Sequence, residues 1–264
     1  MTTHPPVTLP TRDRLPQTAD RISVTQYSRR AILAIWAAAA LPMGVLAWVV
    51  APAVANGTGS AALARPLLAC LTVGLVWQFV LAIGLVATEQ RTLRISQLRA
   101  ALWLRPPRSP RTGRVGGRVW LVILPFVVGF GARQLIPAIP HPASRDFGKF
   151  LASDAGKSMF HGSWGWFAVV VAEMVLNTVL GEELLFRGVL LPRMNVAFGD
   201  RDWLANGALF AAYHVHLPWM IPVTLVDTFL IAYPTKRYGS AWIGVAVHSS
   251  QTIVFTLLLL TLVV

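Results

Sequence analysis

The chain has 264 residues, of which 55% are hydrophobic and only 13% are charged, and its formal net charge is +12. This composition is too apolar for an ordinary soluble domain and is typical of a multi-pass membrane protein. The single cysteine, Cys70, excludes a disulfide framework and a cysteine-rich metal site. The basic residues lie between apolar runs, as at an anionic membrane surface, which argues against a nucleic-acid partner.

The first half of the chain predicts a polar tail followed by three membrane spans. Residues 1–30 contain four prolines and five arginines, so we expect a disordered cytoplasmic tail. Residues 89–104 could form an amphipathic helix on the membrane surface. Arg133 lies near the far end of the third span and is expected to snorkel to the headgroups, with an acid on another helix as the alternative partner. The three predicted spans are 31–54, 63–88 and about 119–139.

The second half predicts four further apolar segments. They are residues 163–181, 203–216, 219–233 and 241–264. The second and third of these are short, and they could be tilted spans or a helical hairpin that dips into the membrane. The sequence therefore predicts an all-α polytopic membrane bundle over residues 31–264, with about seven transmembrane helices and an additional interfacial helix.

The basic residues also predict the orientation. With the N-terminus inside, the inner segments carry 18 of the 23 lysines and arginines. This asymmetry favours a cytoplasmic N-terminus and, with seven spans, a C-terminus on the outside of an integral cell-membrane protein. It also places the most polar stretch of the C-terminal half toward the cytoplasmic side.

That stretch contains Glu182 and Glu183 at the end of an apolar segment, followed by Arg187. On a helix, Glu183 and Arg187 stand four apart in the favoured order of acid before base. Glu182 then points about 100° away, on the face that carries Thr178. One glutamate is therefore neutralised in place and the other is free for chemistry. The alternative is an ion-pair cluster at the membrane interface with no catalytic role.

Two later helices add histidines in apolar surroundings. His214 lies four residues after Phe210, and His248 lies four residues before Thr252. Either histidine alone would be interpreted as a structural hydrogen-bonding residue. Two histidines and a glutamate on three helices are what water activation requires, with a base that takes the proton and a donor for the oxyanion.

These three blocks resemble the CPBP family of intramembrane proteases, which includes the CAAX prenyl endopeptidases and bacteriocin-processing or immunity proteins. The family pattern is Glu-Glu-x-x-x-Arg, then Phe-x-x-x-His, then His-x-x-x-Asn. Residues 182–187 and 210–214 match the first two blocks in full, and the third matches through His248 only, because Thr252 stands in the place of asparagine. The resemblance covers about residues 163–256, which we take as the catalytic core.

The resemblance implies a role for each matched residue. Glu182 and His214 would hold and activate the attacking water, and His248 with residue 252 would polarise the scissile carbonyl. Glu183 and Arg187 would shape the site through their ion pair, and Phe210 would pack beside His214.

The resemblance leaves the cofactor open between a metal-free glutamate mechanism and a metalloprotease. Two histidines and one carboxylate suit zinc, which would be held by Glu182, His214 and His248. The implied substrate is a membrane protein or a lipidated peptide in the bilayer.

The departure at Thr252 keeps a second hypothesis open, a non-catalytic scaffold or immunity protein with the same fold. In an active enzyme, oxyanion support would be weaker or would come from Gln251 or Ser249. A proton-coupled transporter is a third hypothesis, with Glu173, Asp227 and Arg133 as its relay.

Other polar residues are assigned simpler roles. We expect His216 at the membrane interface and His141 and His161 in solvent. Glu173, Asn177 and Asp227 are expected to line the same polar cavity or to hold helices together.

Overall fold

The computed structural model describes residues 24–57, 59–137 and 139–264, and these residues confirm the all-α prediction. The α-helices are α1 (Arg29–Val45), α2 (Ala51–Val54), α3 (Ser60–Gln90), α4 (Ile95–Ala101), α5 (Ile123–Ala132), α6 (Phe147–Ala152), α7 (Asp154–Phe160), α8 (Trp164–Val175), α9 (Asn195–Phe198), α10 (Asp202–Tyr213), α11 (Ile221–Leu225), α12 (Tyr233–Tyr238) and α13 (Ala241–Val263).

Several helices continue through segments of wider or tighter winding. The π-helical segments are η1 (Leu46–Val50), η5 (Leu176–Gly181), η6 (Leu184–Leu190) and η11 (Thr228–Ala232). The 3-10 segments are η2 (Gly117–Val122), η3 (Arg133–Leu135), η4 (Ala143–Arg145), η7 (Leu191–Arg193), η8 (Gly199–Arg201), η9 (His214–His216) and η10 (Pro218–Met220).

Among the described residues, four helices are long and apolar enough to cross a membrane, which indicates an integral membrane protein. They are Arg29–Val54, Ser60–Gln90, Gly117–Leu135 and Ala241–Val263. Three correspond closely to predicted spans, and the third ends four residues earlier than expected. The other predicted spans are helices interrupted by π-helical or 3-10 segments.

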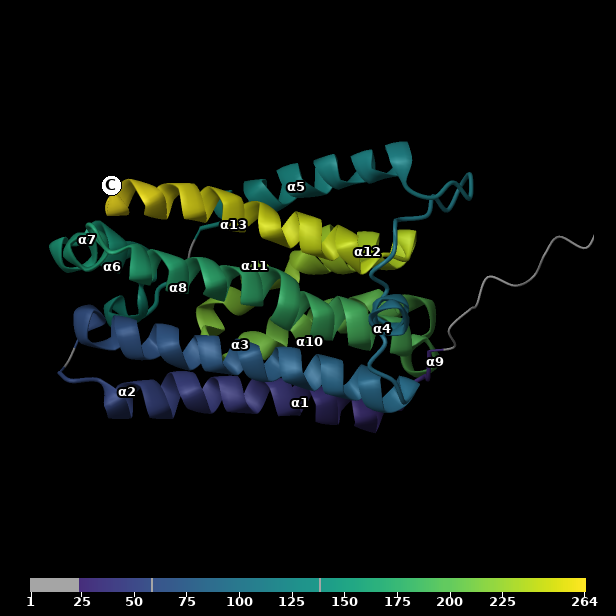
Figure 1. Ribbon diagram of the computed structural model, residues 1–264, viewed down its shortest axis with the longest axis horizontal. Coiled ribbons are helices and arrows are strands. Elements are labelled where there is room, and N and C mark those ends of the chain that lie inside the picture. The colour runs from purple at the N-terminus through teal and green to yellow at the C-terminus, as the bar shows by residue number, and fades with distance from the viewer. Residues whose placement is uncertain (1–23, 58, 138) are drawn as a thin grey trace, which may run out of the picture.

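The predicted fourth span is longer than the sequence suggested. Helical structure runs without a gap from Trp164 through both glutamates to Arg193. This run, called the central helix below, lies between α3 on one side and α13 on the other. Helices α1 and α3 pack together at one edge of the bundle, and α5 packs against α13 at the opposite edge (Figure 1).

The contact between α1 and α3 depends on a proline inside α1. Pro42 has no N–H, so the carbonyl of Ala38, four residues earlier, loses its helical partner. The Trp77 indole of α3 donates to that carbonyl at 2.8 Å. A side chain from the neighbouring helix therefore satisfies the backbone group that the proline leaves free.

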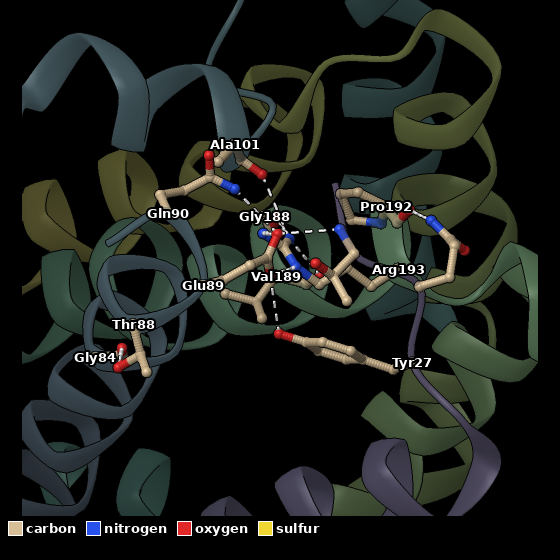
Figure 2. Close-up of polar contacts among 12 residues, drawn as sticks. Tyr27, Gly84, Thr88, Glu89, Gln90, Ala101, Gly188, Val189, Pro192 and Arg193 are labelled. Carbon is tan, nitrogen blue, oxygen red and sulfur yellow. Dashed lines mark hydrogen bonds and ion pairs between the residues drawn. The ribbon is translucent and has the colours of Figure 1, made fainter. Parts of the chain in front are cut away.

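The end of the central helix is fixed by the fully buried Arg193 (Figure 2). Its guanidinium donates to the carbonyl of Val189 at 2.9 Å and forms an ion pair with Glu89, at the end of α3, at 2.7 Å. The Tyr27 hydroxyl donates to the same carboxylate at 3.2 Å. Partial burial of the Tyr27 side chain raises the pKa of its hydroxyl. We call Tyr27, Glu89 and Arg193 the Arg193 cluster.

Three expectations for the first half need correction. Residues 1–23 lie outside the described residues, but the expected tail does not extend to residue 30, because the Tyr27 N–H donates to the Arg193 carbonyl and α1 begins at Arg29. The expected amphipathic helix over 89–104 is reduced to α4. Arg133 does not snorkel, because it is buried and forms an ion pair with Asp227 at 2.6 Å.

Candidate active site

The π-helical segment η5 determines which way Glu182 points. The Glu182 N–H donates to the carbonyl of Asn177, five residues earlier, as in a π-helix. This wider winding brings residues five apart onto one face, whereas an α-helix places them about 140° apart. Glu182 therefore lines one cavity together with Asn177 and Glu173. Thr178, four residues before Glu182, contacts α13 through Thr252 and Ser249.

Glu183 is at the centre of a buried ionic cluster. Its Oε1 lies 3.4 Å from Nη1 of Arg187, which confirms the ion pair expected from the spacing. The same oxygen lies 3.0 Å from Nδ1 of His248 on α13. Glu183 and Arg187 are fully buried, and His248 is 4% exposed. The central helix and α13 are thus joined by a carboxylate that is shared between a guanidinium and an imidazole.

A glycine on α13 makes room for this carboxylate. A Cβ at Gly244, four residues before His248, would collide with Oε2 of Glu183 and would lie 3.2 Å from Cγ of Arg187. Without a side chain here, the two helices approach closely enough for the bond to His248. The sequence offered one signal for this residue, its position one helical turn before a histidine.

Phe210 lies between the two histidines. Its ring is 5.0 Å from the ring of His214 and 6.1 Å from that of His248, both edge-on, and the Arg187 guanidinium lies 3.9 Å from its centroid. The expected packing of Phe210 beside His214 is therefore confirmed. His214 also donates from Nδ1 to the Phe210 carbonyl at 2.9 Å, because a carbonyl oxygen can only accept.

Three hydroxyl groups connect the central helix to α13 beside this cluster. Oγ1 of Thr178 lies 3.1 Å from Oγ1 of Thr252 and accepts from Ser249 at 3.1 Å. Thr178 itself donates to the carbonyl of Met174. The hydroxyl of Thr252, at the position where the family pattern has asparagine, is therefore engaged with another helix.

Glu182 lines a cavity of about 370 Å³. The hydroxyl of Tyr213 lies next to its carboxylate, and Tyr213 accepts from Gln78 of α3 at 2.5 Å. Gly181 contacts Leu75, in the middle of α3, so the site lies at mid-depth of the bundle rather than near one end. Sequence reasoning missed Gln78, although it is an isolated amide in an apolar helix.

The far part of the cavity is bounded by the loop before α6. Arg145 and Asp146 line it there, and Asp146 also forms an ion pair with His141 at 3.2 Å. The backbone N–H of Lys149 donates to the Asp146 carboxylate and lowers its pKa. This carboxylate is therefore ionised at neutral pH.

Two further histidine expectations are corrected and one is confirmed. His216 is buried rather than interfacial, stacks on His214 at 5.4 Å within the 3-10 segment η9, and lines the cavity. His141 is not simply solvated, because its ring stacks on Trp219 at 4.9 Å. His161 is exposed, as expected.

Arg133 also forms polar contacts beside α13, separate from the Glu183 cluster and the three hydroxyl groups. Arg133 donates to Oε1 of Gln251 at 3.1 Å as well as pairing with Asp227. Its guanidinium lies 3.8 Å from the Phe130 ring, which in turn lies 5.7 Å from the His248 ring. The pairing gives Asp227 the helix-joining role expected for it.

The described residues do not fit the zinc site considered above. Within residues 24–57, 59–137 and 139–264, no three His, Cys, Asp or Glu side chains are grouped so that they could hold a metal ion. A metalloprotease is therefore unsupported by this geometry.

Comparison with known proteins bears on the same part of the chain. Residues 163–254 match the family model of the Rce1-like type II CAAX prenyl endopeptidases. The resemblance seen in the three sequence blocks is thereby confirmed over this segment. No curated protein and no solved structure matches the chain. The Rce1-like segment holds Glu182, Glu183, Arg187, Phe210, His214 and His248, and its family suggests a protease that acts on protein or peptide substrates.

Proposed function

We propose that the protein is an intramembrane endopeptidase that hydrolyses peptide bonds of membrane-associated or lipid-anchored proteins. The observation that carries this proposal is Glu182, a buried carboxylate that faces a cavity inside an Rce1-like helical bundle. A carboxylate within a membrane protein is costly to retain unless it has a function.

The hydrogen bonds of the two histidines support different roles. His214 donates from Nδ1 to a backbone carbonyl, so its Nε2 has a free lone pair that can accept a proton from water. His248 donates from Nδ1 to the carboxylate of Glu183, which orients its ring so that Nε2 can serve the oxyanion. One histidine is thus suited to be a base and the other to be a donor.

In the proposed reaction, Glu182 and His214 orient a water molecule and take its proton as the oxygen attacks the scissile carbonyl carbon. His248 donates to the oxyanion that forms. The proton held by the base then moves to the leaving amine as the carbon–nitrogen bond breaks. Glu183 and Arg187 act on this reaction by holding His248 in place.

A non-catalytic scaffold of the same fold is the second candidate. It is favoured by Thr252, whose hydroxyl is engaged with Thr178 and is not available to an oxyanion. Such a protein would keep the helical contacts of the site and would lack turnover.

We also propose the membrane arrangement. The four long apolar helices and the interrupted helices between them would make seven crossings, with the N-terminus in the cytoplasm. The catalytic core over 163–256 is the proposed functional part of the helical domain.

The decisive test compares new protein termini in membranes that carry wild type, Glu182→Gln or the control Asp154→Asn, at matched expression. Asp154 is an exposed carboxylate outside the bundle interior. Termini shared by wild type and the control but missing with Glu182→Gln are expected. Identical profiles for all three proteins, with Glu182→Gln folded and inserted, would contradict the protease and favour the scaffold.

A further inference from the structure

Glu173 is a second acidic residue in the cavity, and neither the proposed reaction nor the family pattern uses it. It lies on α8, nine residues before Glu182, and only 9% of it is exposed. No described residue forms a hydrogen bond or an ion pair with its carboxylate, although seven ion pairs occur among the described residues. It lines the cavity directly.

The groups beside Glu173 in the cavity are also hydrogen-bond acceptors. Asn177, one helical turn later, has a buried Oδ1 without a partner among the described residues. Glu182 follows on the same face because of η5. This part of the cavity therefore presents two carboxyl groups beside the Asn177 amide, and a ligand that supplies donors would pair with them.

Another part of the cavity lining is apolar, and Arg145 is the one lysine or arginine among the described residues that lines the cavity. Leu67, Leu68 and Leu71 of α3 form this apolar part together with Phe150. Nη2 of Arg145 donates to the Ala47 carbonyl at 3.0 Å, its guanidinium lies 3.7 Å from the Trp48 ring centroid, and its buried Nη1 has no hydrogen-bond partner among the described residues, so it forms no ion pair with Glu173. The pocket thus combines a hydrocarbon wall with an uncompensated acid.

We propose that Glu173 and Asn177 form a subsite for a lysine or arginine side chain of the substrate. The aliphatic stem of such a side chain lies along the leucines of α3, and its cation pairs with Glu173. An ionised carboxylate in apolar surroundings needs a cationic partner, and here the ligand provides it. The identity of the ligand as a substrate rests on the proposed protease function, whereas binding of a cation does not.

The first test measures binding without turnover. n-Hexylammonium, an alkyl chain with a cationic end, is titrated into the detergent-solubilised full chain, with 1-hexanol as the neutral analogue, and the dissociation constants are measured by calorimetry. The proteins are wild type, Glu173→Gln and the control Met174→Leu, which changes a neighbouring apolar residue of the same cavity.

We expect n-hexylammonium to bind wild type and Met174→Leu with similar affinity and Glu173→Gln at least tenfold more weakly. 1-Hexanol should not distinguish the three proteins. Glutamine keeps one acceptor oxygen, so a ligand recognised only through neutral N–H groups would bind Glu173→Gln nearly as well. Equal affinity of n-hexylammonium for wild type and Glu173→Gln, or no binding to wild type, would overturn the subsite.

The second test uses the cleavage sites. Among termini that depend on Glu182, a lysine or arginine is expected at one fixed position relative to the cleaved bond, and Glu173→Gln should abolish this enrichment. Glu182-dependent termini without a basic position would overturn the subsite and leave the protease standing. Absence of Glu182-dependent termini would overturn the proposed protease function. The binding titration by itself would then test the cation site.

Discussion

Two histidines in one site are made chemically different by the atoms that accept their Nδ1 protons. The Nδ1–H of His214 is accepted by a neutral backbone carbonyl, whereas that of His248 is accepted by the carboxylate of Glu183. The partner of each ring, more than the residue type, therefore decides which imidazole can act as a base and which as a donor.

At the same scale, Thr252 is expected to limit the rate. Its hydroxyl is engaged with Thr178, and an asparagine here would offer an amide donor to the oxyanion. Because one such donor is typically worth about a hundredfold or more in rate, Thr252→Asn should raise the cleavage rate by roughly tenfold to a hundredfold. The rate is measured on a substrate identified by the comparison of termini.

Thr252→Val is the matched control, because it keeps the shape of the side chain and removes the hydroxyl. It should change the rate by less than about threefold if the hydroxyl only joins helices. A large loss with Thr252→Val would show instead that the hydroxyl already serves the reaction. No gain with Thr252→Asn, in a protein that folds, would contradict the limiting role.

At the scale of helices, the sequence predicted which segments meet but not how the central helix turns. The blocks 182–187, 210–214 and 248–252 were expected to converge, and the Glu183–Arg187 pair and the packing of Phe210 on His214 are present. A helical wheel with about 100° per residue places Glu173 and Glu182 on opposite faces, whereas η5 winds more slowly and brings them to one cavity. No residue pattern marks a π-helical segment.

The sequence also did not predict which polar residues far apart in the chain contact each other. Arg133 and Asp227 are 94 positions apart, and Gln78 and Tyr213 are 135 apart. Each residue could be recognised as an unusual polar group in an apolar helix. Its partner depends on packing, which one sequence does not reveal.

The Arg193 cluster is expected to stabilise the end of the central helix. Glu89→Gln would remove the anion that compensates the buried Arg193, and breaking a buried pair in this way typically costs about 3–5 kcal/mol. We therefore expect a clear loss of thermal stability in detergent. Asp200→Asn, an exposed carboxylate beyond the same helix end, should leave the stability nearly unchanged. Equal melting temperatures for wild type and Glu89→Gln would contradict this assignment.

At the scale of the whole molecule, the charge asymmetry predicts the orientation in the membrane. The only cysteine, Cys70, is buried, so single cysteines can be introduced on a Cys70→Ala background. The exposed positions Lys157 and Arg201 lie in segments assigned to opposite sides. A membrane-impermeant maleimide should label Lys157→Cys in intact cells and Arg201→Cys only after permeabilisation. The reverse result would invert the proposed topology.

The Arg133–Asp227 pair has a further consequence, because it crosses the boundary of the Rce1-like segment. Asp227 lies within residues 163–254, and its cation comes from η3, outside them. A chimera that moved this segment into another helical bundle would carry a buried carboxylate without its counter-ion. Transplanting the segment with η3 and α5 as one unit avoids that penalty, so the smallest portable form of the site is larger than the part that sequence comparison detects.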